Sequence, residues 1–113
     1  MKNDCVFCAI IAGEIPAKAV YEDDLMIVIP DIKPVARLHY LVIPKEHYSV
    51  LAEMKESSAA DLGRIFKKIP GLAGRLGFEN GYRLIINQGE DAGQSVGHLH
   101  IHLVGGQKMK FEV

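Results

Sequence analysis

Tryptophan is absent from the 113-residue sequence, cysteine occurs only twice, and neither sign of charge dominates. The 13 lysines and arginines nearly balance the 14 aspartates and glutamates, which argues against the broad basic surface that binds nucleic acid. No apolar run approaches the ~20 residues that span a bilayer, so we expect no membrane partner. Two cysteines are too few for a disulfide framework, and the start Met1-Lys2-Asn3-Asp4 does not resemble a signal peptide, so we expect a cytoplasmic protein.

The sequence does contain enough apolar material for one core. Hydrophobic residues make up 49 % of it, and no repeat or linker divides it, so we expect a single domain over residues 1–113. Patterning predicts a short helical turn at 6–13 and strands at 19–21, 25–29, 38–43, 82–87 and 98–104. The connection between the last two strands is too short for a crossover helix, so they should pair antiparallel. The result is an α+β domain with one main helix on an antiparallel sheet.

The main helix is expected at 58–76, where apolar residues follow helical spacing: Leu62, Ile65, Phe66, Ile69, Leu72, Ala73 and Leu76. Ser58 with Asp61 resembles a capping box, and Gly77 suits the position just after a helix. Pro70 conflicts with this prediction, because an internal proline removes a hydrogen bond and clashes with the preceding turn, at a cost of ~3 kcal/mol. We therefore expect a kink or a break at Pro70.

The most informative stretch alternates histidine with apolar residues: His98, Leu99, His100, Ile101, His102 and Leu103. In an extended strand, residues i, i+2 and i+4 point to one face, so the three imidazoles share one face and the apolar side chains share the other. Each imidazole brings a donor and an acceptor that need partners, which makes such a row costly as packing alone. The pattern is typical of chemistry near neutral pH.

Three histidines can hold a catalytic zinc ion. Along one strand, however, they spread over ~13 Å at ~3.3 Å per residue, so one ion cannot bind all three. At most two neighbouring rings could chelate together, and different roles along a line explain the row better. A metalloenzyme stays as an alternative hypothesis, to be recognised by activity that depends on metal.

The loop before this row, residues 89–97, contains three glycines. Such a loop can turn backbone N–H groups toward a phosphate, and Gln94 and Ser95 add side-chain donors. Glu90 and Asp91 would repel an anion and are expected to face solvent. Glycine-rich hairpin loops are also common without a ligand, so the phosphate-binding interpretation of this loop depends on the histidines beside it.

Cys5 and Cys8 form a C-x-x-C pair, and His39 and His47 are the two histidines outside the row. Two cysteines at this spacing together with two distant histidines can make a Cys2His2 zinc site. The same pair could instead be a redox couple or two buried thiols. Spacing alone leaves these three interpretations open.

Together these motifs resemble the histidine triad family of nucleotide-binding hydrolases and transferases. The resemblance spans residues 5–106 and rests on the histidine row and on these stretches: Gly13-Glu14-Ile15-Pro16, Tyr21-Glu22-Asp23-Asp24, His39-Tyr40-Leu41-Val42-Ile43-Pro44-Lys45, Gly81-Tyr82-Arg83 and Gly93-Gln94-Ser95. The ending Gly105-Gly106 is similar to that of the phosphoramidate-hydrolase branch. This resemblance implies a five-stranded antiparallel sheet, a short N-terminal helix beside the main one, and a homodimer that joins two sheets.

The resemblance also implies catalytic roles. His100 would attack the α-phosphorus of a purine nucleoside phosphoramidate, or of an aminoacyl or lysyl adenylate, to form a nucleotidyl-histidine that water then hydrolyses. Its other ring nitrogen would donate to a backbone carbonyl near His98. His102 and Ser95 would contact the phosphate and assist the leaving amine, and His39 would support the cluster, although it could also be an ordinary strand histidine.

Further residues would bind the nucleotide. Asp31 would bind the ribose hydroxyls and Asn87 would lie near the sugar and phosphate. Phosphate oxygens would be held by the loop at Gly93, Gln94 and Ser95, together with His100 and His102. The purine would lie among four apolar residues that would otherwise be assigned to the core: Phe7, Ile10, Ile29 and Ile32. Relatives often carry an aromatic residue and a histidine at the positions of Ile29 and Pro30, so adenosine and guanosine are both open as substrates.

In many relatives a structural zinc ion is held by residues matching Cys5, Cys8, His47 and His98. All four are present, so the resemblance implies zinc with no open coordination position. His98 is then a ligand or a scaffold residue and need not take part in the reaction. Two alternative functions are a nucleotide-binding adaptor with incidental turnover and a dinucleoside polyphosphate hydrolase.

Overall fold

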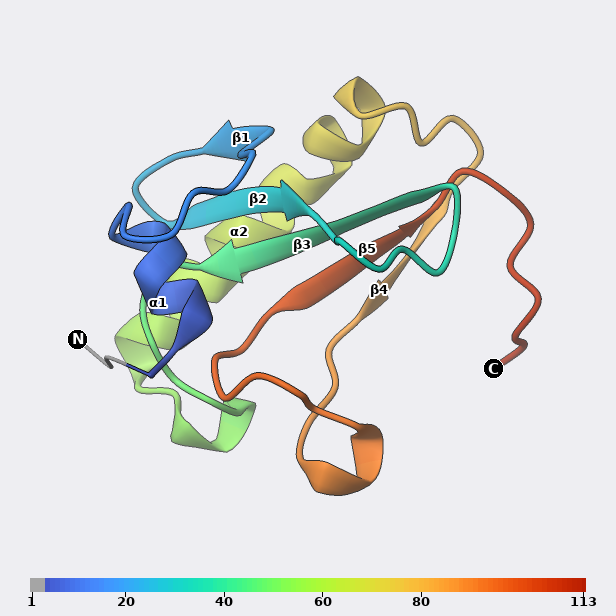
Figure 1. Ribbon diagram of the computed structural model, residues 1–113. Helices are drawn as coiled ribbons and strands as arrows, with labels where there is room; N and C mark the ends of the chain where they lie inside the picture. Colours follow the sequence, from blue (N-terminus) through green and yellow to red (C-terminus); the bar gives the residue numbers. More distant parts are fainter. Residues whose placement is uncertain (1–3) are drawn as a thin grey trace.

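The computed structural model describes residues 4–113, and the first three residues, part of the start compared above with signal peptides, lie outside it. Its antiparallel sheet has the strand order β1-β2-β3-β5-β4 (Figure 1). The strands are β1 (Tyr21–Glu22), β2 (Met26–Pro30), β3 (Leu38–Pro44), β4 (Tyr82–Ile85) and β5 (Ile101–Gly105). The helical elements are α1 (Val6–Ile11), α2 (Glu56–Arg75) and the 3-10 turns η1 (Leu51–Glu53) and η2 (Glu90–Ala92). The α+β class, the five strands and the antiparallel pairing of β4 with β5 are confirmed.

The sheet separates two apolar clusters. The larger one lies between the sheet and α2 and includes Met26, Val28, Val42, Leu62, Ile65, Ile69, Leu72, Leu99, Ile101 and Leu103. The smaller one lies under α1 on the opposite face: Cys5, Phe7, Cys8, Ile27, Ile29, Leu41 and Ile43. Alternate residues of β2 and β3 therefore enter different clusters, as expected for strands buried on both faces. Because α1 is short and lies near the C-terminal end of β3, it covers only one end of that face (Figure 1).

α2 packs with the predicted stripe, since five of its residues are buried and two are half-buried beside them: Leu62, Ile65, Ile69, Leu72 and Ala73, with Phe66 and Leu76. Gly77 follows the helix with φ +97°, and the Phe78 N–H donates to the Ala73 carbonyl at 3.0 Å, the predicted glycine-type end. The predicted capping box is wrong. The helix begins at Glu56, and Ser58 is buried with its hydroxyl donating to Glu46 Oε2 at 2.7 Å.

Pro70 lies inside α2, which continues through it to Arg75, so of the expected kink or break the break is wrong and the kink stays a prediction. The neighbouring Ile69 and Leu72 are 0 % and 3 % exposed. Burial of two such side chains, worth about 1.5–3 kcal/mol each, offsets the ~3 kcal/mol that an internal proline costs. In the described part of the chain, no helix, α2 included, is both long and apolar enough to cross a bilayer.

β5 begins at Ile101, three residues later than predicted. The backbone groups before it are used elsewhere: the Leu99 N–H donates to the Tyr48 carbonyl at 2.7 Å, and the His98 carbonyl accepts from a ring nitrogen of His100 at 2.8 Å. Backbone groups held in this way cannot join the sheet ladder. The first two histidines of the row are therefore held by specific contacts outside the regular strand.

Candidate active site and metal centre

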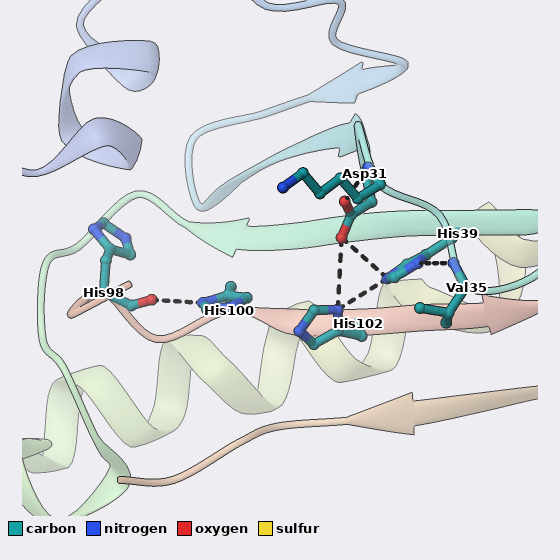
Figure 2. A network of polar contacts seen from close by, with 7 residues as sticks. Asp31, Val35, His39, His98, His100 and His102 are labelled. Carbon is teal, nitrogen blue, oxygen red and sulfur yellow. Dashed lines mark hydrogen bonds and ion pairs between the residues drawn. The ribbon is translucent and has the colours of Figure 1, made fainter. Parts of the chain in front are cut away.

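The histidine row has the predicted two-sidedness. Leu99, Ile101 and Leu103 enter the core beneath α2, while the imidazoles lie on the face that carries α1. The Phe7 ring of α1 packs edge-on against both His98 and His100, with centroid distances of 5.8 and 5.1 Å. Each histidine meets different partners, as different roles along a line require, and the roles themselves stay a prediction (Figure 2).

His100 has a ring orientation set by the backbone. Its Nδ1 lies 2.8 Å from the His98 carbonyl oxygen. A carbonyl can only accept, so Nδ1 carries the proton and the Nε2 of the neutral ring keeps its lone pair. The ring is only 7 % exposed. The predicted carbonyl contact is therefore present, and it leaves the far nitrogen suited to nucleophilic attack.

His98 turns its ring the other way. Its Nε2 donates to the Pro44 carbonyl at 2.7 Å, which leaves the Nδ1 lone pair directed toward three other ligand atoms. Nδ1 lies 3.5 Å from Cys5 Sγ, 3.7 Å from Cys8 Sγ and 3.1 Å from His47 Nδ1. The pair Cys8 Sγ and His47 Nδ1 is 3.2 Å apart.

These four atoms fit a tetrahedral zinc ion. Bond lengths of ~2.3 Å to sulfur and ~2.0–2.1 Å to nitrogen make the edges of a Cys2His2 tetrahedron about 3.3–3.8 Å long, close to the distances between the four ligand atoms. All four atoms lie within 4.8 Å of one another. The N-terminal helix, the segment after β3 and the histidine row thus converge on one candidate metal centre, called below the metal-binding group and defined as Cys5, Cys8, His47 and His98.

A second cluster joins His39, His102 and Asp31 (Figure 2). His39 Nε2 lies 2.9 Å from His102 Nδ1 and 3.3 Å from Asp31 Oδ2, and His102 Nδ1 lies 4.0 Å from the same oxygen. Burial lowers the pKa of both histidines, and the Asp31 carboxylate partly opposes this shift. Neutral imidazoles are therefore favoured at physiological pH in the absence of a ligand.

This second cluster is compact enough for a metal but lacks the necessary lone pair. The Val35 backbone N–H donates to His39 Nδ1 at 3.1 Å, so that nitrogen is an acceptor and the neutral ring carries its proton on Nε2. Nε2 is the atom that faces Asp31 and His102. Because a metal ligand must offer a lone pair there, the donor set does not fit a cation.

The loop 88–97 is braced by the side chain of Gln94. Its Oε1 accepts from the Gly89 N–H at 2.9 Å, and its Nε2 donates to the carbonyls of Ser49 and Val96 at 2.8 and 3.1 Å. Both amide hydrogens are thus engaged within the protein, which leaves backbone groups to meet a phosphate. Ser95 is exposed, and its hydroxyl forms no hydrogen bond within the described part of the chain.

The other predicted nucleotide residues are distributed unevenly. Phe7 and Ile29 are buried in the cluster beneath α1, against which Ile10 is half-buried. Ile32 is 93 % exposed, and Asn87 is half-buried in the loop after β4. As expected, Glu90 and Asp91 face solvent. Phe7 is the member of this set with a ring contact to the histidine row.

Sequence reasoning missed the groups that orient the rings. The Pro44 carbonyl, the Val35 N–H and the contact of Asp31 with two histidines have no signature in residue spacing. For Asp31, the resemblance indicated only a ribose contact. The rule that a neutral imidazole has one donor and one acceptor predicted that partners exist, although only the fold identifies them.

Comparison with known proteins agrees with this architecture. A family model described as the HIT domain matches residues 12–109. Protein HitA of Neisseria gonorrhoeae is 45 % identical over 103 residues, which cover 91 % of this chain and 96 % of that protein. A solved HIT family hydrolase from Clostridium thermocellum has a TM-score of 0.92 and 47 % identity, with 100 % and 99 % of the two chains covered. A Zn-bound histidine triad family protein from Mycobacterium smegmatis has a TM-score of 0.80 and 38 % identity over 96 % of this chain and 81 % of that one. The chain belongs to the HIT family.

Proposed function

We propose that this protein is a hydrolase of purine nucleoside phosphoramidates or of aminoacyl or lysyl adenylates, acting through a nucleotidyl-histidine. The observation that carries the proposal is the contact of His100 Nδ1 with the His98 carbonyl, which assigns the lone pair of the neutral ring to Nε2. A protein that only binds nucleotides has no need for a nucleophile fixed in this tautomer. The similar structure from Clostridium thermocellum, named a HIT family hydrolase, supports the same class of reaction.

The reaction has two steps. Nε2 of His100 forms a bond to the α-phosphorus as the bond from phosphorus to the leaving atom breaks, which is nitrogen in a phosphoramidate and a carboxylate oxygen in an adenylate. A leaving amine takes a proton from Nε2 of a His102 ring protonated on both nitrogens, and the ring becomes neutral. Water then attacks the same phosphorus, gives a proton to His102, and breaks the bond to His100. The loop carrying Gly93, Gln94 and Ser95 would hold phosphate oxygens, Asp31 the ribose, and Phe7 one wall of the site.

Turnover of a fluorogenic adenosine phosphoramidate tests the proposal. We expect the native protein to release the fluorophore, and His100→Ala to abolish release while AMP binding by calorimetry stays close to native. Asp91→Asn, a change at an exposed loop carboxylate, is the matched control and should turn over normally. No release by native protein that still binds AMP would reject the enzyme in favour of the adaptor. Faster turnover of a dinucleoside polyphosphate would favour the alternative function, a dinucleoside polyphosphate hydrolase.

We also propose that the metal-binding group of Cys5, Cys8, His47 and His98 holds one structural zinc ion. The distances between its four ligand atoms support this, and so does the Zn-bound relative from Mycobacterium smegmatis. With four protein ligands, zinc would tie α1 to the sheet and supply no open position for substrate. Thiolate ligands require reduced cysteines, which supports a cytoplasmic location.

Elemental analysis of protein refolded with zinc chloride under reducing conditions should give about one zinc per chain for a single four-ligand site. Cobalt in its place should show the intense absorption of thiolate coordination, a readout independent of activity. His47→Asn should weaken metal retention, whereas Asp91→Asn should not. Protein that refolds but retains no metal would reject the zinc site and leave the proposal for His100 intact.

We further propose a homodimer formed by a second copy at the free edge of β4. This strand pairs with β5 alone, and three of its four residues expose large apolar surfaces: Tyr82, Leu84 and Ile85. An exposed apolar edge strand is a template for pairing with another chain. Sedimentation equilibrium should give the mass of two chains, and Leu84→Lys should shift it toward one. A native monomer at micromolar concentration would reject this arrangement.

A further inference from the structure

We propose that Asp31 and His39 act as a positioning pair that sets which nitrogen of His102 holds the proton for the leaving group. The inference rests on the proposed hydrolase function. It gives Asp31 a second role, which acts through His102, in addition to the ribose contact. It is carried by the contacts among these three side chains and by the Val35 N–H (Figure 2).

The first step is the fixed tautomer of His39. The Val35 N–H occupies Nδ1 of His39, so the ring cannot be protonated there without losing that hydrogen bond. The neutral His39 ring therefore presents an Nε2–H donor toward His102 Nδ1, 2.9 Å away. While His102 is neutral, its Nδ1 accepts this bond and its own proton resides on Nε2. That is the nitrogen left to face a substrate.

The second step concerns Asp31, whose two oxygens have separate partners. Oδ1 accepts from the Lys33 N–H at 2.8 Å, which fixes the carboxylate in its turn. Oδ2 lies 3.3 Å from His39 Nε2 and 4.0 Å from His102 Nδ1. One oxygen is thus near both ring nitrogens. When His102 gains a second proton, on Nδ1, that N–H and the Nε2–H of His39 no longer share a hydrogen bond, and Oδ2 is the oxygen of opposite charge that lies near both.

Acid catalysis needs this second state. A neutral His102 that gave up its Nε2 proton would become an anion, whereas a His102 protonated on both nitrogens becomes neutral. The proton on Nε2 passes to the leaving nitrogen as its bond to phosphorus breaks, and His102 keeps the Nδ1 proton facing Asp31. Nε2 then carries a lone pair and accepts a proton from the water that cleaves the intermediate. The same nitrogen serves both steps, as microscopic reversibility requires.

The charges around His102 agree with this assignment. The titratable groups that act on it are His100 from its own segment, His39 from β3 and Asp31 from the turn after β2. Burial lowers the pKa of His102 and the two histidines lower it further, while Asp31 is the group that raises it. Paired with His102 across β4 and β3 are Ile85 and Leu41, which carry no charge.

Asp31→Asn tests the inference because asparagine keeps the shape and loses the charge. The substrates share an AMP group and differ in the leaving group: an alkyl amine, which needs a proton, and p-nitrophenolate, which does not. We expect kcat for the amine to fall about tenfold or more and kcat for the p-nitrophenyl ester to change by less than about threefold. Asp91→Asn is the matched control, and thermal melting establishes that each variant is folded.

A ribose contact alone predicts a different result. It would raise KM equally for both leaving groups, and Asp31→Asn would have no effect on the 2′,3′-dideoxy form of the amine substrate. We expect the dideoxy substrate to show the same loss of kcat as the ribose substrate. Equal effects on both leaving groups, or no effect on the dideoxy compound, would overturn the inference while leaving the proposed function standing. Lack of any turnover by native protein would instead reject that function.

Nitrogen NMR of the native protein gives a test that needs no variant. In the neutral state, long-range proton–nitrogen correlations should show protonated Nε2 and unprotonated Nδ1 for both His39 and His102. A neutral His102 with its proton on Nδ1 would contradict the assignment, whatever the kinetics.

Discussion

Two aspartates occupy similar turns at opposite ends of β2 and have different consequences. Asp23 precedes the strand and Asp31 follows it, and in each the Oδ1 oxygen accepts backbone N–H groups of its own turn. The contrast lies in Oδ2. In Asp23 it accepts from Lys68 Nζ and from the Tyr21 hydroxyl, both at 2.7 Å. In Asp31 it faces two histidines.

The two aspartates differ in whether the charge of their partners changes with pH. Lys68 is charged throughout the physiological range, so Asp23 ties the β1–β2 turn to α2 under all ordinary conditions. Burial alone would raise the pKa of Asp23, but the hydrogen bonds from Lys68, Tyr21 and two backbone amides hold it well below its usual range. The partners of Asp31 are two imidazoles whose pKa burial lowers below the ordinary ~6.5, so they gain charge only as the pH falls below that value. The same carboxylate geometry thus ties two elements together at one turn and faces the histidines of the proposed active site at the other.

The largest expected effect comes from making the same substitution at both turns. Asp31→Asn should lower kcat for an amine-leaving substrate about tenfold or more while the midpoint of urea unfolding stays near native. Asp23→Asn should do the reverse, with kcat unchanged and stability lower by roughly 1–3 kcal/mol, because several donors lose their charged acceptor. Urea unfolding and steady-state kinetics on the two variants decide it. If both variants lost kcat and stability together, the two aspartates would not have the separate roles assigned to them.

A smaller effect is expected in the pH dependence of stability. The folded pKa of Asp23 lies below the unfolded value, which is ~3.9, so its stabilisation is complete above that pH and is lost as the pH falls toward the folded pKa. The unfolding free energies of native protein and Asp23→Asn should therefore differ by a constant amount above about pH 5 and converge below about pH 4. A difference that already shrinks between neutral pH and pH 5 would contradict this assignment.

The buried histidines contribute to stability over another pH range. Their contribution is the same in native protein and in Asp23→Asn, so it cancels in the difference between the two unfolding free energies. Burial lowers the folded pKa of His39 and His102 below the unfolded value of ~6.5. Their neutral forms therefore favour folding above ~6.5, and this contribution is lost as the pH falls from there toward their folded pKa. Native protein should lose stability in two stages on acidification, and only the later stage should respond to Asp23→Asn.

The smallest expected effect is that of Lys68→Met. Lys68 is exposed at the surface of α2, and such ion pairs contribute little to stability. Its removal should lower the melting temperature by less than Asp23→Asn does, and the decrease should shrink in high salt because screening has already weakened the pair. A larger loss than that of Asp23→Asn would mean that the turn depends on the cation more than on its own hydrogen bonds.

Most of the fold could be predicted from sequence because periodicity decides it. The helical stripe from Leu62 to Leu76 placed α2 to within two residues at each end, and the alternation around Ile101 located β5 but put its start three residues too early. The failures have local causes. Ser58 does not cap α2, because its hydroxyl donates to Glu46, twelve residues earlier in the sequence. The helix continues through Pro70 because the neighbouring Ile69 and Leu72 are deeply buried.

The site was predictable where a motif supplied the residues and unpredictable where the backbone orients them. The metal-binding group and the His98 carbonyl contact of His100 lie where expected. Gln94 was expected to offer its side chain to phosphate, but loop carbonyls already use both amide hydrogens. The assigned roles of Ser95, Asn87 and Ile32 remain predictions.

His98 belongs to two sites at once, because its ring points to the metal-binding group and its carbonyl holds His100. His98 therefore couples the position of its own imidazole to the direction of the His100 ring two residues later. Anyone transplanting this histidine row into another scaffold would have to move the two thiols and His47 along with it. Without them, His98 would lose the contacts of its ring, and the carbonyl that orients His100 would be less well fixed.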